Sequence, residues 1–180
     1  MLYNFTIENS CFFVKDFYFI KKNDETDLSF IPPLIRRKLS NIDKLTVCAI
    51  NKIYNDKVDE IVFSSKVGEF DRLNSIISQY QEFDEVSPST FSGFVHNYPV
   101  SFFTLFKKIT IPYHALSSGD DSFYMGLIKA IISKKENVLY VYSDDVTIAL
   151  LITKKEGKKF NLNEIPKSPN DFINLIERQN

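Results

Sequence analysis

The sequence is poor in glycine and contains no tryptophan. Gly accounts for 5 of the 180 residues, about 3% where ~7% is usual. The common phosphate-binding loops require several glycines at fixed spacing, in the patterns Gly-x-x-x-x-Gly-Lys and Gly-x-Gly-x-x-Gly. Neither pattern occurs in the chain, and this argues against ordinary nucleotide chemistry.

Cysteine and excess charge are also missing. The two cysteines, Cys11 and Cys48, are too few for a disulfide framework or a cysteine-based zinc site, and they fit a reducing compartment. Lys and Arg total 22 against 23 Asp and Glu, so the basic excess typical of nucleic-acid binding is absent. We find no signal-peptide pattern and no apolar run near the ~18 residues of a membrane span. A cytoplasmic protein without a membrane span is expected.

Aromatic and aliphatic residues are plentiful, with 17 Phe, 9 Tyr and 44% hydrophobic residues overall, so a substantial core is expected. Periodicity predicts strands at 2–20 (broken near 8–10), 61–64, 109–111, 138–142 and 147–153. It predicts helices at 33–54, 70–83, 121–134 and 169–178, and one starting at Asn97. Residues 86–89 are expected to form a turn and 154–159 a charged hairpin tip. This alternation predicts one three-layer α/β domain over residues 1–180.

Few residues are candidates for catalysis. The only histidines are His96 and His114, which is too few for a convincing zinc site. Ser117 or Ser118 could in principle act with His114 and Asp144 in a small Ser-dependent acyltransferase or hydrolase. However, the Gly-x-Ser-x-Gly elbow is absent, and a hydrogen-bonded structural role for each histidine is favoured.

The cluster Arg36-Arg37-Lys38 is the most compact group of cations near the N-terminus. It could contact an acidic partner such as a phosphopantetheine carrier protein. A structural role is favoured, either as a solvated helix start or through arginine stems that pack on the aromatic N-terminal strands.

Four stretches taken together resemble the β-ketoacyl synthase-like N-terminal family, which includes chain-length-factor-like proteins of aryl polyene and related pigment pathways. The stretches are FIPPLIRRKLS (30–40), FSSKVGE (63–69), SPSTFSGFVHN (87–97) and SGDDSF (118–123). The resemblance covers residues 30–145. It implies an α/β, three-layer thiolase-like half fold, with a mixed sheet of about five strands flanked by helices.

The sequence departs from active members of that family in two ways. Active ketosynthases carry a nucleophilic Cys at the start of a helix and two histidines in a second half. The matching stretch here, residues 114–119, places Leu116 at or next to the Cys position. Only 35 residues follow Asp145, too few for a second half. The resemblance therefore implies no catalytic nucleophile, with Ser117 and His114 as weak substitutes, and neither a cofactor nor a metal.

The resemblance also implies a partner surface. In thiolase-type dimers the strand before the nucleophile helix pairs with its counterpart across the two-fold axis. Here that strand is expected at residues 108–113, with contacts from Ile109, Thr110, Ile111 and Tyr113 and, beside them, from Phe94, His96 and Asn97.

The leading hypothesis is a non-catalytic, chain-length-factor-like subunit of fatty-acid-like, polyketide or aryl polyene biosynthesis. It would form a heterodimer with a full-length ketosynthase, or a homodimer with a second copy. A carrier protein would contact Arg36, Arg37 and Lys38, and Phe and Tyr side chains would line the acyl tunnel. A homodimeric interaction module without acyl chemistry remains the third alternative.

Overall fold

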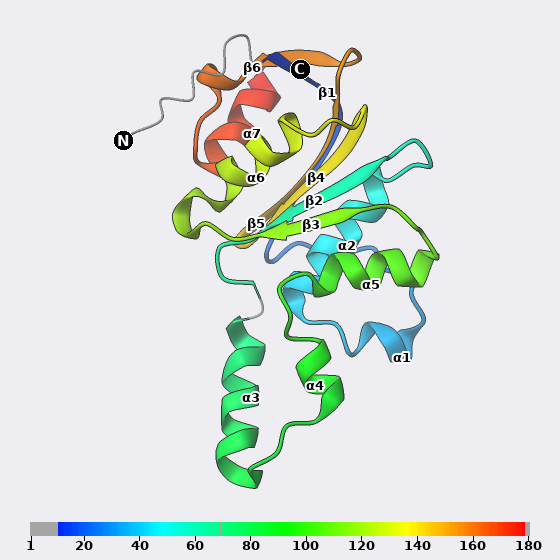
Figure 1. Ribbon diagram of the computed structural model, residues 1–180, viewed down its shortest axis with the longest axis vertical. Coiled ribbons are helices and arrows are strands. Elements are labelled where there is room, and N and C mark those ends of the chain that lie inside the picture. The colour runs from blue at the N-terminus through cyan, green and yellow to red at the C-terminus, as the bar shows by residue number, and fades with distance from the viewer. Residues whose placement is uncertain (1–10, 69, 179–180) are drawn as a thin grey trace.

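The computed structural model describes residues 11–68 and 70–178, and it is built around one six-stranded sheet (Figure 1). The strand order is β3-β2-β4-β5-β1-β6. The strands are β1 (Cys11–Lys21), β2 (Glu60–Ser64), β3 (Tyr113–Leu116), β4 (Asn137–Ser143), β5 (Val146–Thr153) and β6 (Lys158–Asn161). β2 pairs in parallel with β3 and β4, and the pairs β4–β5, β5–β1 and β1–β6 are antiparallel. The sheet is therefore mixed, as expected, with six strands rather than five.

Helices cover both faces of the sheet (Figure 1). α2 (Asn41–Ile53) and α5 (Tyr98–Lys107) lie on one face, and α6 (Ser122–Ile131) and α7 (Pro169–Arg178) lie on the other. The central strand β2 shows why two cores form. Ile61 and Phe63 pack into the core under α2 and α5, whereas Val62 packs into the core under α6 and α7. Successive side chains of a strand point to opposite faces, so a continuous apolar run supplies both cores.

The helix expected over residues 33–54 is in fact two helices. α1 (Pro33–Arg36) is one turn long, and α2 begins after a break. The cause is a capping box. The Ser40 hydroxyl accepts a hydrogen bond from the Asp43 backbone N–H at 3.1 Å, and the Asp43 carboxylate accepts one from the Ser40 N–H at 2.9 Å. This reciprocal pair satisfies two N–H groups at the start of α2 and separates it from α1.

Two helices project from the body of the molecule (Figure 1). α3 (Phe70–Phe83) confirms the helix predicted there. α4 (Pro88–Ser92) replaces the second half of the turn expected at 86–89, because the Ser87 hydroxyl accepts from the Thr90 N–H and caps a short helix that Pro88 begins. We call α3, α4 and the residues between them, 70–92, the arm.

The prediction of a strand at residues 109–111 is wrong. Lys108 adopts a left-handed conformation (φ 56°) that ends α5, and residues 109–112 are irregular. The ladder with β2 begins when the Pro112 carbonyl accepts from the Ile61 N–H at 3.1 Å, so β3 occupies Tyr113–Leu116. Pro112 thus directly precedes the strand.

Other boundaries also differ. The charged stretch 154–159 is not a hairpin tip, because β1 lies between β5 and β6. α6 is shorter than the expected 121–134 and follows a 3-10 turn at Gly119–Asp121. The expected strand at 2–20 is described only from Cys11, and its first part lies outside the described residues. The predictions at 61–64, 138–142, 147–153 and 169–178 are confirmed. Within the described ranges, no helix combines the length and apolar character needed to cross a membrane.

Candidate functional site

A cleft of about 730 Å³ lies where the parallel strands β2 and β4 end. Ligand sites in open α/β sheets form at the carboxyl ends of the strands, because the following loops diverge there. The charged residues that line the cleft are three lysines (Lys22, Lys66, Lys167) and four aspartates (Asp120, Asp121, Asp144, Asp145). Tyr142 and the start of α2 complete the wall.

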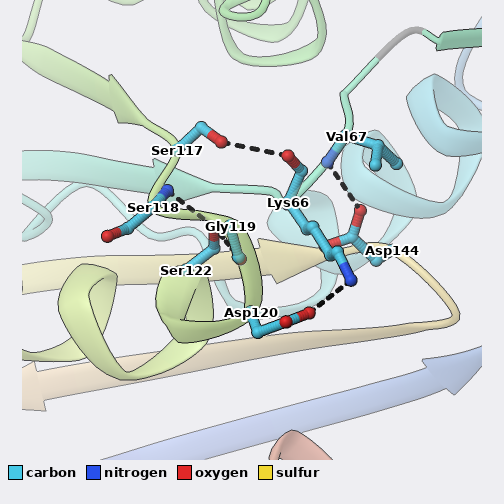
Figure 2. Close-up of polar contacts among 8 residues, drawn as sticks. All are labelled: Lys66, Val67, Ser117, Ser118, Gly119, Asp120, Ser122 and Asp144. Atoms are coloured by element: carbon cyan, nitrogen blue, oxygen red, sulfur yellow. Dashed lines mark hydrogen bonds and ion pairs between the residues drawn. The ribbon is translucent and has the colours of Figure 1, made fainter.

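Asp144 fixes the loop that follows β2 (Figure 2). Its carboxylate accepts hydrogen bonds from the Ser65 hydroxyl at 2.9 Å and from the backbone N–H groups of Lys66 and Val67 at 2.7 and 3.4 Å. The negative charge of Asp144 also helps burial to raise the pKa of Tyr142. The hydrogen bonds accepted by Asp144 are thus structural: they hold residues 65–67 in place at the cleft mouth.

Lys66 crosses the cleft to the loop before α6 (Figure 2). Its ammonium forms an ion pair with Asp120, which raises the pKa of Lys66 and lowers that of Asp120. The Lys66 carbonyl accepts from the Ser117 hydroxyl at 3.0 Å. These two contacts connect the ends of β2 and β3 without supplying a base for Ser117.

Leu116, which the resemblance places at or next to the Cys position, is the last residue of β3. Its side chain is half-buried against the core under α6. Five residues separate it from α6, so the nearest helix N-terminus begins well beyond it. Cys48 is buried in the core on the other face of the sheet, and Cys11 is exposed at the start of β1. A thiolate is activated by a helix N-terminus or a nearby cation, and Leu116 offers no group for such activation.

His114 does not meet the serines. Its Nε2 lies 2.7 Å from Oε1 of Glu60, a buried carboxylate at the start of β2. Glu60 also accepts from the Ser133 hydroxyl and lies 3.8 Å from the Lys129 ammonium. The sequence reasoning missed Glu60, although an acidic residue directly before a buried apolar strand was a signal that it needs partners.

His96 and Asn97, expected at a partner surface, turn inward to β3. The His96 Nε2 lies 3.0 Å from the Leu116 carbonyl, and the Asn97 amide donates to the Tyr113 hydroxyl at 3.1 Å. Asn97 stands at the start of α5 as predicted, but its side chain does not cap that helix. Gly68 makes room for His96, since a Cβ at Gly68 would lie 2.7 Å from Nδ1 of His96. The side chains of His96 and Asn97 therefore hold α5 against β3 through these hydrogen bonds.

The other predicted residues lie at the surface in different degrees. Phe94, Ile109, Ile111 and Tyr113 are half-buried, and Thr110 is exposed. In the cationic cluster, Arg37 and Lys38 are exposed, whereas the Arg36 guanidinium folds back to donate to the Ile31 carbonyl at 2.9 Å.

Residues 15–154 match the family model described as the β-ketoacyl synthase N-terminal domain. The chain belongs to this family. The match extends beyond the 30–145 expected from the motifs. A search of curated proteins finds no match.

Solved structures of ketosynthase complexes share the fold. A chain of the ketosynthase (ApeO) in complex with its chain length factor (ApeC) from Xenorhabdus doucetiae superposes with a TM-score of 0.69 at 22% identity, covering 81% of this chain and 80% of that chain. The ishigamide ketosynthase/chain length factor gives 0.56 at 10% identity and covers 66% of this chain. A chain of the complex between a type II polyketide synthase acyl-carrier protein and its ketosynthase gives a TM-score of 0.57 at 10% identity and covers 81% of this chain. The alignments span 44% and 63% of these last two chains. The three-layer thiolase-like fold is therefore confirmed.

Proposed function

We propose that this chain is a non-catalytic, chain-length-factor-like subunit that pairs through β3 with a full-length ketosynthase. One observation carries the proposal: β3 is an edge strand of the sheet. It ends at Leu116, which we expect at or next to the position of the nucleophile in active ketosynthases. In the described part of the chain, no strand pairs with the outer side of β3.

The backbone of β3 is suited to receive another strand. The carbonyls of Pro112 and Leu116 accept from β2, so the alternate residues, Tyr113 and Ala115, direct their N–H and C=O groups outward. The opposite edge of the sheet, β6, begins with Lys158 and Lys159, and lysines on an edge oppose pairing. β3 contains neither Lys nor Pro.

Apolar side chains on both flanking helices extend this surface. Leu105 of α5 is exposed, as are Met125 and Ile132 at and just beyond α6. Met125 and Ile132 share a helix face with Lys129, whose ammonium reaches Glu60 beside His114 of β3. An edge strand between two exposed apolar helix faces is suited to an obligate protein interface.

The chain would contribute surface and not chemistry to the pair. Leu116 cannot form a thioester, and the Ser117 hydroxyl is directed to a backbone carbonyl. The acyl chain would form on the ketosynthase, in a fatty-acid-like or aryl polyene pathway, with Phe and Tyr side chains of this chain lining the tunnel. Arg37 and Lys38 are the exposed cations that would contact an acidic carrier protein, and Arg36 would support them.

The test is complex formation with the full-length ketosynthase of the same organism, measured by light scattering after size exclusion. Wild type should form a 1:1 heterodimer. Ala115→Pro removes an outward N–H without touching the ladder to β2 and should abolish the complex, whereas Ala115→Ser keeps the N–H and should preserve it. Absence of a complex with wild type, or equal binding of the Pro and Ser variants, contradicts the proposal.

A further inference from the structure

The arm carries an apolar face that the rest of the described chain leaves largely uncovered. Leu73, Ile76, Ile77, Tyr80 and Phe83 of α3 recur at helical spacing and share one face about 120° wide. Leu73 and Ile76 are half-buried, but the face becomes exposed toward the tip: Ile77 is 44%, Tyr80 57% and Phe83 64% exposed. Phe91 of α4 adds a further exposed ring, at 58%. Contiguous exposed apolar patches of this kind mark interaction sites.

The charge of the arm limits what can cover it. No Lys or Arg occurs between Arg72 and Lys107, whereas Glu82, Asp84 and Glu85 are grouped and exposed at the arm's tip. Arg72 itself is held by Asp43. The tip is thus both apolar and anionic, and an acidic partner such as a carrier protein would be repelled there.

A groove of about 490 Å³ at the tip shows which side chain would fit. It is lined by Phe83 and Glu85, by Gln79, and by Val86, Ser87 and Pro88 at the start of α4. An aromatic ring beside a carboxylate is suited to a Lys or Arg side chain, through a cation–π contact and an ion pair.

The arm begins and ends next to the proposed pairing edge. α3 follows β2, and the segment after α4 returns to β3, where His96 bonds the Leu116 carbonyl. The arm therefore starts after β2, ends close to the edge strand β3, and projects beyond the sheet (Figure 1). A subunit that pairs with β3 would lie within reach of the arm.

We propose that the arm is a second docking element for the ketosynthase subunit: its aromatic tip packs on an apolar surface of that subunit, and the Phe83–Glu85 groove receives a Lys or Arg from it. This rests on the proposed function, since it takes the same partner. It adds a contact separate from strand pairing, with a recognisable chemistry: basic side chains rimming an apolar patch.

The experiment measures Kd for the full chain and the full-length ketosynthase by titration calorimetry at two salt concentrations. Phe83→Ser and Tyr80→Ser should each weaken binding by roughly 10- to 100-fold, as interface aromatics do. Leu34→Ser removes an even more exposed apolar side chain, from α1, and should leave Kd unchanged. The double variant Glu82→Lys/Glu85→Lys should weaken binding. Its Kd should also no longer rise between low and high salt, as the wild-type Kd should. Circular dichroism verifies that each variant is folded.

The outcomes separate the two proposals. If wild type binds and the arm variants bind equally well, the arm proposal is overturned while the proposed function stands. If wild type does not bind the ketosynthase at all, the proposed function fails and the arm proposal fails with it. Tighter binding after the Glu→Lys changes assigns the arm to an acidic partner and overturns the proposal. If the chain alone is a dimer in native mass measurements, and Phe83→Ser makes it a monomer, a second copy is the occupant instead.

Discussion

The guanidinium of Arg72 lies 2.8 Å from the Asp43 carboxylate and joins the arm to the start of α2. Arg72 also donates to the carbonyls of Lys38 and Gly93 and lies over the Tyr98 ring at 5.2 Å. One side chain at the root of α3 thus contacts the segments that precede α2, follow α4 and begin α5. Because a helix of this length is marginal alone in water, this anchor matters for the whole arm.

Replacing Arg72 by Met should lower the free energy of unfolding by about 3 kcal/mol. Asp43 is fully buried, so its carboxylate would lose a charged partner in a site with little access to water. Urea unfolding followed by circular dichroism measures the change. Lys52→Met is the matched control: it breaks an ion pair with Asp27 at 3.7 Å in which both side chains are exposed, and it should cost less than ~1 kcal/mol. Equal losses for the two variants would show that Arg72 is no anchor.

Sequence patterns predicted most of the sheet because its strands are apolar runs bounded by polar residues, as in 138–142 and 147–153. They failed at β3. Ile109-Thr110-Ile111 has high strand propensity, but the left-handed Lys108 and the missing N–H of Pro112 delay the ladder until Tyr113. The break before α2 could have been found, because Ser40 and Asp43 form the spacing of a capping box.

Less of the candidate site than of the sheet could be predicted from the sequence. The assignment of Leu116 at or next to the Cys position rests on motif order alone and stays a prediction. The roles of Glu60 and Arg72 depend on burial by segments distant in the sequence, and spacing does not show which charged side chains become buried. The same holds for His96, whose contact with the Leu116 carbonyl appears only once β3 and the start of α5 are side by side.

Asp144→Ala should release the loop at the cleft mouth. The variant leaves the Ser65 hydroxyl and the N–H groups of Lys66 and Val67 without their acceptor, at a cost of about 1–3 kcal/mol. Hydrogen exchange at Lys66 and Val67 should become at least ~10-fold faster, since opening free energy sets the protection of an amide. Asp145→Ala changes the exposed neighbouring carboxylate and should leave both amides protected. Unchanged exchange in Asp144→Ala would remove Asp144 from this role.

Gly126→Ala should destabilise the chain even though Ala is the better helix former. A Cβ at this position of α6 would lie 2.4 Å from the Ser64 hydroxyl oxygen and 2.6 Å from the Tyr140 ring. Such overpacking costs typically 1–3 kcal/mol, which exceeds the ~1 kcal/mol gained in helix propensity. Thermal unfolding is the measurement. Asn174→Ala, on the exposed face of α7, should be neutral or slightly stabilising, and a stable Gly126→Ala would mean that α6 can move away from β2 and β4.

Two buried tyrosines should make the fold sensitive to alkaline pH. Burial raises the pKa of the Tyr140 phenol well above its usual range, and burial together with the Asp144 charge raises that of Tyr142. In the unfolded chain both phenols ionise near pH 10. The folded state therefore keeps protons that the unfolded state has lost once the pH exceeds about 10. The stabilisation is complete below that pH and declines above it, by up to about 1.4 kcal/mol for each pH unit and each tyrosine.

Urea unfolding at pH 8, 9, 10 and 11 tests this sign. Tyr142→Phe should flatten the decline between pH 10 and 11, because the Phe ring has no proton to lose in either state. Tyr140→Phe should flatten it too, although stability at pH 8 also falls, since the phenol bonds the Ser64 hydroxyl at 2.9 Å and the Phe123 carbonyl. Tyr80→Phe, whose ring is exposed on the arm, is the control and should keep the wild-type slope. If all three variants lose stability as steeply as wild type, the alkaline sensitivity arises from other groups and the buried phenols do not couple folding to pH.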